Sequence, residues 1–408
     1  MRKLFFVLIL SIIAGSCKTE TKAPISIYDT VTFLASDSLK GRATGSTDEL
    51  ASATYLAQKL EDLGYGPRGE NGSYFQTFTF KTKIDPHTEI TYIEAGDSTT
   101  TGTNVAGFFD NGTDKTIILG AHYDHLGMGG QGSLHRGEPA IHNGADDNAS
   151  GVAAILKLAE TLKDSLEQSN VLVLFFSGEE LGLLGSNYFV KNPTINLDQA
   201  HFMVNLDMVG RLRDERTLSI SGVGTSPIFN QTLNANNADF KLVLKESGVG
   251  PSDHTSFYLQ DIPVLHFFTG QHEDYHKPSD DSEKLNYEGI QDIVNYLTDL
   301  CIDLDDNAPL TFKKTKNESE EVPRFKVALG VIPDYLFDGK GMRIDGVSEN
   351  KPAQMAALKK GDVVIKLGDS TIVDMMSYMR ALSSFEEGDQ TQVTVDRDGK
   401  KITKTIQF

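Results

Sequence analysis

The sequence predicts an α/β fold in which helices cover both faces of a mainly parallel central sheet. Apolar runs at 116–121, 171–176 and 202–206 are continuous, which is typical of strands buried on both faces. Strand-like and helix-like segments alternate from about residue 115 to 300, as expected when helices connect parallel strands. A polar segment at 305–324 has the composition of a linker, and a compact, strand-rich region follows it.

Helical spacing of apolar residues indicates three helices around this sheet. The first begins at the capping sequence 46–49 and continues to about Leu60. The second follows residue 148 and places Val152 and later apolar residues on its inner face. The third covers about residues 287–304. With 408 residues, the chain is long enough for two or three domains.

The N-terminus is predicted to be an export signal that is not part of the fold. Arg2 and Lys3 precede an apolar run at 4–14, which has signal-peptide length and is shorter than the roughly 20 residues of a membrane span. The run ends in Ala14-Gly15-Ser16-Cys17, which resembles a bacterial lipoprotein box with Ala at the position usually held by Leu. The alternative is ordinary cleavage near Ser16, which leaves Cys17 free.

The lipoprotein interpretation predicts a signal peptide at 1–16, a lipidated Cys17 and a polar tether over 17–26. The expected product is an exported bacterial lipoprotein, anchored in the membrane and located in the periplasm or at the cell surface. Lipidation of Cys17 would leave only Cys301, so we expect no intramolecular disulfide.

The charge of the chain restricts its partners. Lys and Arg number 38 and Asp and Glu 57, so the formal net charge is −19. Nucleic acid is excluded as an expected partner, because phosphate binding needs basic patches. Most of the excess carboxylates must be solvated surface residues.

Five short segments carry side chains that bind metal ions. Three of them directly follow the predicted strands, where ligands gather in α/β sheets. Zinc takes imidazole nitrogen and carboxylate oxygen, and paired metals about 3.5–4 Å apart can clamp the attacking and leaving oxygens of a reaction. Three carboxylates and one hydroxide would balance two Zn²⁺ ions. The five segments are His122-Tyr123-Asp124, Gly144-Ala145-Asp146-Asp147-Asn148, Gly178-Glu179-Glu180, Asn205-Leu206-Asp207 and Tyr275-His276.

Together with the sequences at 33–37, 41–46 and 270–274, these segments resemble the co-catalytic di-zinc aminopeptidase family, which also contains glutamate carboxypeptidases and glutaminyl cyclases. The resemblance covers roughly residues 28–303. It implies a zinc exopeptidase domain at 27–304 that binds two Zn²⁺ ions.

The resemblance also implies a role for each matching residue. His122, Asp147 and Asp207 would hold one zinc, and Asp147, Glu180 and His276 the other, so Asp147 would bridge the two. The remaining roles are Glu179 as general base, Asp124 as the carboxylate that orients His122, Tyr275 as an oxyanion donor, and Asp253 and His254 as supporting or substrate-facing residues.

Several nearby residues have an alternative reading. Asp146 competes with Asp147 for the bridging position, and family position favours Asp147. Asp280 matches a family carboxylate but fits a surface role equally well. His125 stands where many relatives carry Ser and is predicted to be a loop residue. The glycine-rich segment 127–132 lacks the ending of a phosphate loop and is predicted to be a flexible loop beside the metal site.

Residues 325–408 resemble a bacterial PDZ domain. The resemblance is carried by 328–332, 347–353 and 358–364, and Asp398-Gly399 predicts a hairpin between the last two strands. Backbone amides at Leu329, Gly330 and Val331 would bind the C-terminal carboxylate of a peptide that adds a strand to the sheet. The alternative is a domain that only packs on the peptidase.

These observations predict a zinc-dependent exopeptidase, specifically an aminopeptidase that hydrolyses N-terminal residues from peptides through a metal-bridging hydroxide with Glu179 as base. The expected partners are peptide substrates, peptide C-termini at the PDZ domain, and a membrane through the lipid anchor only. Two alternatives are a glutaminyl-cyclase-like transferase that uses one zinc and a non-catalytic, PDZ-based binding protein.

Overall fold

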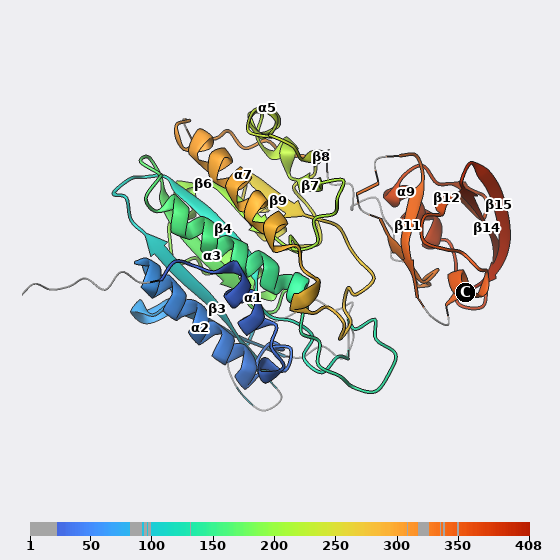
Figure 1. Cartoon of the computed structure of the whole chain (residues 1–408), viewed down its shortest axis with the longest axis horizontal. Helices are drawn as coiled ribbons and strands as arrows, with labels where there is room; N and C mark the ends of the chain where they lie inside the picture. The colour runs from blue at the N-terminus through green and yellow to red at the C-terminus, as the bar shows by residue number, and fades with distance from the viewer. Residues whose placement is uncertain are drawn as a thin grey trace, which may run out of the picture.

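The computed structural model describes residues 23–81, 92–93, 96, 99–130, 132–307, 309–316, 326–334, 336–337, 339–348 and 351–408. They form a larger and a smaller domain that lie next to each other (Figure 1). The predicted signal peptide, Cys17 and most of the tether lie outside this part of the chain. Within it, no helix is both long and apolar enough to cross a membrane.

The larger domain alternates helices and strands along the chain, as the sequence predicts. The three predicted helices are α2, α3 and α7. Its helices are α1 (Ile27–Leu34), α2 (Thr47–Leu63), α3 (Gly151–Leu162), α4 (Leu184–Lys191), α5 (Phe229–Ala235), α6 (His254–Tyr258) and α7 (Tyr287–Asp305). Its strands are β1 (Gly66–Pro67), β2 (Phe75–Lys81), β3 (Thr99–Phe109), β4 (Thr116–His122), β5 (Asn170–Phe176), β6 (Ala200–Leu206), β7 (Thr217–Ser221), β8 (Lys241–Lys245) and β9 (Val264–Phe268).

Local chemistry explains where α2 begins and ends. The Ser46 side chain accepts a hydrogen bond from the backbone N–H of Glu49 at 3.0 Å and so caps a donor that has no partner within the helix. Gly64 ends the helix in the left-handed conformation, with φ 88°, which costs glycine no steric strain.

The strands of the larger domain form one mixed sheet. Among the described residues its order is β1-β3-β5-β4-β6-β9-β7-β8, with β2 also paired to β3. The central neighbours β5, β4, β6 and β9 run parallel, whereas β3 and β7 join them in antiparallel orientation. The carboxyl ends of β4, β5 and β6 therefore meet at one edge of the sheet.

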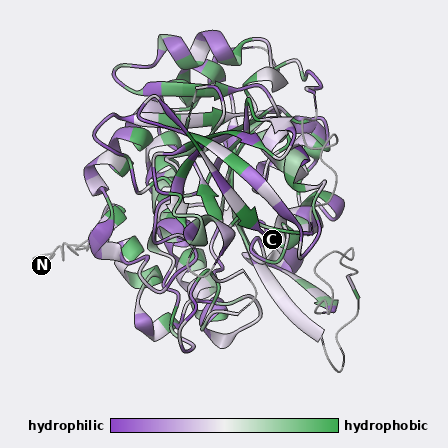
Figure 2. Ribbon diagram, turned by 90° about the vertical axis from the view of Figure 1, so that its right-hand side faces the viewer, coloured by the Kyte–Doolittle hydropathy of each residue, from purple (hydrophilic) through white to green (hydrophobic). Residues whose placement is uncertain are grey.

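Side chains from the central strands enter a different hydrophobic core on each face of the sheet. On β4, Ile117 and Leu119 join the core beneath α2, α3 and α7, and Ile118 joins the core beneath α4 and α6. Helices α3 and α7 lie on the same side of the sheet in Figure 1. In Figure 2 many helices alternate between hydrophobic and hydrophilic segments, as expected for helices that cover a sheet. This confirms the predicted two-sided burial.

Among the described residues, the smaller domain is an antiparallel sheet with two short helices. Strands β14 and β15 form the predicted hairpin, because Arg397 pairs with Lys400 across Asp398-Gly399. The sheet order is β10-β11-β12-β14-β15, with β13 paired to β12. The elements are β10 (Val331–Pro333), β11 (Met342–Val347), α8 (Pro352–Met355), β12 (Val363–Leu367), β13 (Ser370–Thr371), α9 (Met375–Leu382), β14 (Gln390–Arg397) and β15 (Lys400–Gln407).

The described part of the predicted linker lies against the larger domain. Asp305 ends α7, and its carboxylate accepts hydrogen bonds from the backbone of residues 167 and 168. Lys313 donates its backbone N–H to the carbonyl of Thr225 at 2.8 Å, and Thr315 bonds the hydroxyl of Tyr258. The larger domain therefore binds this segment as far as Thr315.

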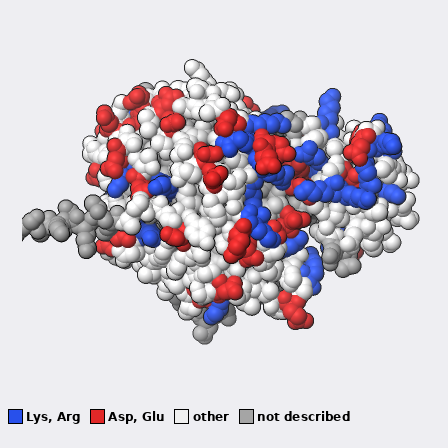
Figure 3. All heavy atoms as spheres, in the orientation of Figure 1, with Lys and Arg blue, Asp and Glu red and all other residues white. Residues whose placement is uncertain are grey.

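An ion pair links the two domains. Arg213 of the larger domain forms an ion pair with Asp345 on β11, with a nitrogen–oxygen distance of 2.7 Å. The same Arg213 nitrogen donates to the carbonyl of Gln271 at 2.8 Å. On the face shown in Figure 3, acidic residues are spread over the larger domain, and Lys and Arg gather towards the smaller one.

Candidate metal centre

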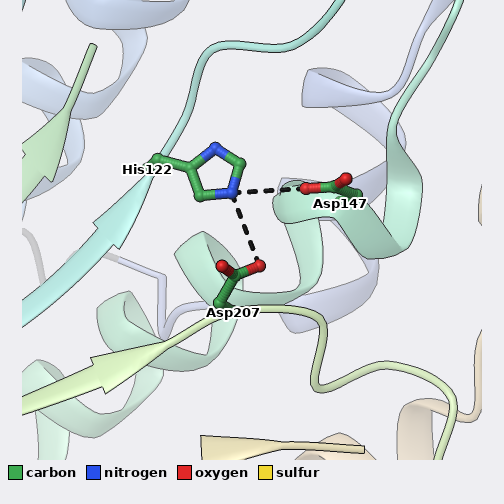
Figure 4. Close-up of side chains that lie close together, drawn as sticks. All are labelled: His122, Asp147 and Asp207. Atoms are coloured by element: carbon green, nitrogen blue, oxygen red, sulfur yellow. Dashed lines mark ion pairs between the residues drawn. The ribbon is translucent and has the colours of Figure 1, made fainter. Parts of the chain in front are cut away.

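Three of the predicted ligands meet at the carboxyl ends of β4 and β6. His122 is the last residue of β4, and Asp207 directly follows β6. The Nε2 atom of His122 lies 3.3 Å from Oδ1 of Asp147 and 3.4 Å from Oδ1 of Asp207 (Figure 4). All three donor atoms lie within 4.8 Å of one another, which is close enough to share one metal ion.

A second set of donors shares Asp147 with the first. The Nε2 atom of His276 lies 3.2 Å from Oδ2 of Asp147 and 3.1 Å from Oε2 of Glu180. The two oxygens of Asp147 therefore face two different histidines. This is the geometry expected of a carboxylate that bridges two metal ions.

The donor set fits zinc. Zinc bonds to His nitrogen and carboxylate oxygen are about 2.0–2.2 Å long, so neighbouring donors of a tetrahedral site stand roughly 3.3–3.6 Å apart. Two donor pairs of the first set are 3.3 and 3.4 Å apart, and two of the second set are 3.2 and 3.1 Å apart, at or just below this spacing. His122 and His276 both direct Nε2 towards carboxylates. The structure thus brings the predicted ligand residues together.

Backbone carbonyls orient the rings of both histidines. Nδ1 of His122 lies 3.3 Å from the carbonyl oxygen of Asp124, and Nδ1 of His276 lies 2.8 Å from that of Gly132. A proton on Nδ1 satisfies each carbonyl and leaves the Nε2 lone pair for a metal. Gly132 belongs to the predicted loop beside the metal site, so this loop also positions a ligand.

A tight turn presents Asp147 to both histidines. Gly144 precedes the turn Ala145–Ser150 with φ 56°, and a Cβ there would collide with the carbonyl of Asp147 and the ring of His125. Oδ2 of Asp280 accepts the backbone N–H groups of Asp146 and Asp147 at 2.9 and 3.1 Å. Asp280 is fully buried, so the surface role considered for it is wrong.

Arg42 holds the same turn from the other side. Its guanidinium is fully buried and donates to the carbonyls of Leu34, Tyr123, Asn143, Gly144 and Asp147. Burial lowers the pKa of Arg42 to about 10, so it stays charged at neutral pH. In the sequence Arg42 stands out only as part of the motif 41–46, because most of its carbonyl partners are distant in sequence.

The structure separates the two adjacent aspartates. Asp146 is turned away from the histidines of the site. Its Oδ1 accepts the backbone N–H of Gly210 at 2.6 Å, and its Oδ2 lies 3.1 Å from Nε2 of His272. Asp147 alone of the two faces both His122 and His276.

Glu179 lines the cavity that contains Asp147 and Asp207. Its backbone N–H donates to Oδ1 of Asp124 at 3.1 Å, and Thr44 donates to Oδ2 of the same carboxylate. Burial raises the pKa of Glu179 well above its usual range. Its neighbour Glu180 faces His276, so the two glutamates point to different partners.

The Asp124 carboxylate accepts a hydrogen bond from the backbone of Glu179 but not from the ring of His122. Its Oδ1 lies 3.7 Å from Nδ1 of His122, which is longer than a hydrogen bond. Its hydrogen bonds go to Glu179 and Thr44 instead. The backbone carbonyl oxygen of Asp124 is therefore closer to Nδ1 of His122, at 3.3 Å, than its carboxylate is, at 3.7 Å.

The other predicted site residues lie around the same centre. Tyr275 lines the cavity and stacks on His276, with ring centroids 3.8 Å apart. Asp253 is fully buried, and burial raises its pKa to about 7. His254 stacks on His266 at 4.5 Å, so it lies behind a residue that lines the cavity.

His125 is closer to the metal centre than the sequence analysis predicted. Its Nδ1 lies 2.8 Å from Oε1 of Glu180, and neither atom has a well-formed hydrogen bond. Donor atoms of His125, Asp147 and Glu180 all lie within 4.8 Å of one another. The sequence offers one signal for this, the position of His125 three residues after His122. The expectation of a loop residue follows instead from the Ser that many relatives carry there.

Comparison with known proteins agrees with this geometry. Residues 104–301 match the sequence profile of Peptidase family M28, and residues 310–408 match that of the PDZ domain. The predicted resemblance to co-catalytic zinc aminopeptidases followed by a PDZ domain is thereby confirmed.

Individual relatives are similar over different shares of their length. The chain is 28% identical to Aminopeptidase YwaD of Bacillus subtilis (strain 168) over 45% of this chain and 39% of that protein. It is 25% identical to Leupeptin-inactivating enzyme 1 of Streptomyces exfoliatus over 87% of this chain and 78% of that protein. A crystal structure of a zinc aminopeptidase from Bacillus subtilis has a TM-score of 0.54 and 18% identity, and covers 72% of this chain and 98% of its own. That likeness confirms the zinc-exopeptidase fold.

Proposed function

We propose that this chain is a zinc-dependent exopeptidase that removes N-terminal residues from peptides. The observation that carries the proposal is the pair of donor sets that share Asp147, with Glu179 lining the same cavity. The match to Peptidase family M28 and the similarity to aminopeptidases support hydrolysis of peptide bonds. The donor spacing supports zinc, and the two sets support two ions.

Zinc ions held by these donors would supply Lewis-acid activation of the scissile carbonyl and of the attacking water. The protein residues then move protons and fix geometry. Glu179 would accept the proton of the attacking water and return it to the leaving amine. Asp124 would keep Glu179 in place through its backbone N–H. The Tyr275 hydroxyl would donate a hydrogen bond to the oxyanion.

A peptide library with free and N-acetylated versions of each sequence tests this proposal. We expect the purified, zinc-loaded protein to release residues only from peptides with a free N-terminus, and a chelator to abolish release. Cleavage of the acetylated peptides from their C-termini would contradict the aminopeptidase assignment. Cyclisation of N-terminal glutamine without hydrolysis would support the transferase alternative, although both donor sets disfavour a one-zinc site.

We further propose that the smaller domain binds the C-termini of peptides. Leu329 and Gly330 lead into β10, and Gly330 has φ 78°, so backbone amides can turn towards a carboxylate there. Strand β10 is at the edge of its sheet among the described residues, so a peptide can add to it as a further strand. Binding of a short peptide, with and without an amidated C-terminus, tests this: only the free carboxylate should bind.

We also propose lipid anchoring through Cys17, on the basis of the signal sequence. Several acyl chains hold a protein firmly on a membrane, so the mature protein should fractionate with membranes. The Cys17→Ser variant should be released or left unprocessed. A native protein that is soluble and carries an unmodified Cys17 by mass spectrometry would contradict this proposal.

A further inference from the structure

One wall of the cavity beside the metal ligands is formed by the neighbouring strands β8, β7 and β9. In their pairing register, Ser221 on β7 stands opposite Lys245 on β8 and opposite His266 on β9. Residues that pair across strands project from the same face of a sheet. Lys245, Ser221 and His266 therefore form a row, and all three line the cavity of about 190 Å³ that also contains Glu179.

Each residue of this row can donate a hydrogen bond. Lys245 carries an ammonium group and Ser221 a hydroxyl. The Asn205 side-chain nitrogen lies 3.2 Å from Nδ1 of His266 and can only donate, so Nδ1 accepts and the proton resides on Nε2. Burial lowers the pKa of His266 to about 4, which keeps the ring neutral at neutral pH. The stacked ring of His254 supports it from behind.

The charges around the cavity are distributed unevenly. The acidic residues that line it, namely Asp147, Glu179 and Asp207, are the metal ligands and the candidate base. Among the described residues that line it, Lys245 is the only lysine or arginine. A buried carboxylate is stable only when it is paired and hydrogen-bonded. An ammonium, a hydroxyl and an imidazole N–H in one row supply the donors that such a group needs.

We propose that Lys245, Ser221 and His266 bind a carboxylate group of the substrate. This inference rests on the proposed peptidase function and adds a substrate class to it. The carboxylate has two sources in a peptide: the acidic side chain of a residue next to the scissile bond, or the free C-terminus of a dipeptide. Both present the same planar anion to the row, and substrates can be chosen that distinguish them.

The test compares kcat/KM for matched substrate pairs. Glutamyl and glutaminyl aryl amides differ in the charge of the side chain only. A dipeptide of two alanines and its C-terminal amide differ in the charge of the C-terminus only. We expect the zinc-loaded full-length protein to prefer the charged member of one pair by roughly tenfold or more, the usual worth of a hydrogen bond to a charged group. The pair that shows the preference identifies the source of the carboxylate.

Variants assign the preference to the row. Lys245→Met keeps the length of the side chain and removes its charge, so it should abolish the preference, because kcat/KM falls more for the charged substrates than for the neutral ones, and its zinc content should equal that of the wild type. Ser221→Ala should reduce the preference by a smaller factor. Lys241→Met is the matched control, because Lys241 is exposed at the other end of the same strand. That variant should behave as the wild type.

A second measurement keeps the inference separate from the proposed function. Calorimetry with free glutamate and glutamine, which are products of the aryl amides, reports binding even without turnover. Suppose that no substrate is hydrolysed, that glutamate binds more tightly than glutamine, and that Lys245→Met removes this difference in affinity. The proposed peptidase function would then be wrong, and the carboxylate site would be supported. Two results would overturn the inference. One is that kcat/KM and the binding affinity are the same for the charged and the neutral member of each pair. The other is that Lys245→Met lowers kcat/KM by the same factor for charged and neutral substrates.

Discussion

Carboxylates in the two domains have different partners. In the smaller domain the buried ones each face a cation: Asp334 pairs with Arg343, Asp345 with Arg213 and Lys360, and Asp362 with Arg397 at 2.6 Å. In the larger domain, the carboxylates of the candidate metal centre face histidines. Members of this second group are Asp147, which is buried, and Glu180 and Asp207, which are half-buried.

This difference indicates which domain performs chemistry. A carboxylate paired with a guanidinium needs no further cation, so the pairs of the smaller domain stabilise local structure. Carboxylates that lie close together in a buried or half-buried cluster repel one another, and added positive charge, which metal ions supply, stabilises them. Changes in the cluster should therefore affect metal binding and catalysis, and changes in the smaller domain should affect substrate preference.

The largest effect should follow from removal of the shared ligand. Asp147→Ala deletes a donor from both sets, so we expect loss of both zinc ions by elemental analysis and loss of measurable peptidase activity. Asp146→Asn, which alters the neighbouring carboxylate, is the matched control and should keep both ions. Equal zinc content in the wild type and Asp147→Ala would break the assignment of the bridge.

Replacement of the candidate base should separate catalysis from metal binding. Glu179→Gln preserves size and removes the basic oxygen, so kcat should fall by roughly 10²–10⁴-fold. Its zinc content should equal that of the wild type, because the proposal gives Glu179 the role of base and not of ligand. Asp362→Asn in the smaller domain should leave kcat for a dipeptide unchanged. Normal turnover in Glu179→Gln would refute the role of Glu179.

A buried acid away from the ligands should make stability depend on pH. Glu49 is buried, and burial raises its pKa from 4.5 to about 8 despite hydrogen bonds from Gly45 and Ser177. The folded state therefore keeps a proton that the unfolded state releases. The free energy of unfolding should fall as pH rises between these two values, by up to about 1.4 kcal/mol per pH unit, and level off above them.

Glu49→Gln removes this titration. The quantity to compare is the free energy of unfolding of the variant minus that of the wild type. This difference should be larger, in favour of the variant, at about pH 8.5 than at about pH 5. Denaturant unfolding of both proteins at the two pH values measures this change. A difference between wild type and variant that does not depend on pH would show that Glu49 is charged in the folded state.

Removal of the smaller domain should have the smallest effect on chemistry. A variant that ends at Lys316 keeps the contacts of Lys313 and Thr315 with the larger domain. We expect unchanged kcat/KM for a dipeptide and a loss of roughly tenfold for a peptide of about ten residues, because tethering raises local concentration. Equal losses on both substrates would mean that the smaller domain is structural.

The sequence could predict the central sheet because its strands carry an uninterrupted signal. Runs such as 171–176 are buried on both faces, so every residue is apolar and the strand is visible without tertiary information. Among the described residues β8 lies at the end of the sheet and β7 beside it, and both are short and contain Thr, Ser or Lys residues, so their strand signal is weak. The sequence does not predict them, yet they form the wall that carries Lys245.

The candidate metal ligands could be named from the sequence for a different reason. Their residue types suit zinc, and the resemblance to the di-zinc aminopeptidase family selects His122, Asp147, Glu180, Asp207 and His276 among the neighbouring acidic and histidine residues. The sequence alone therefore predicts these candidates, the fold class and the two-domain organisation.

The tertiary structure decided what surrounds these ligands. His125 approaches Glu180, Asp280 holds the turn of Asp147, and the donors of the cavity wall come from three strands separated by many residues. Such contacts depend on strand register and loop closure, which are fixed by the packing of distant segments and leave no periodic pattern in the chain. Local sequence therefore specifies the chemistry of each residue, and only long-range pairing specifies its neighbours.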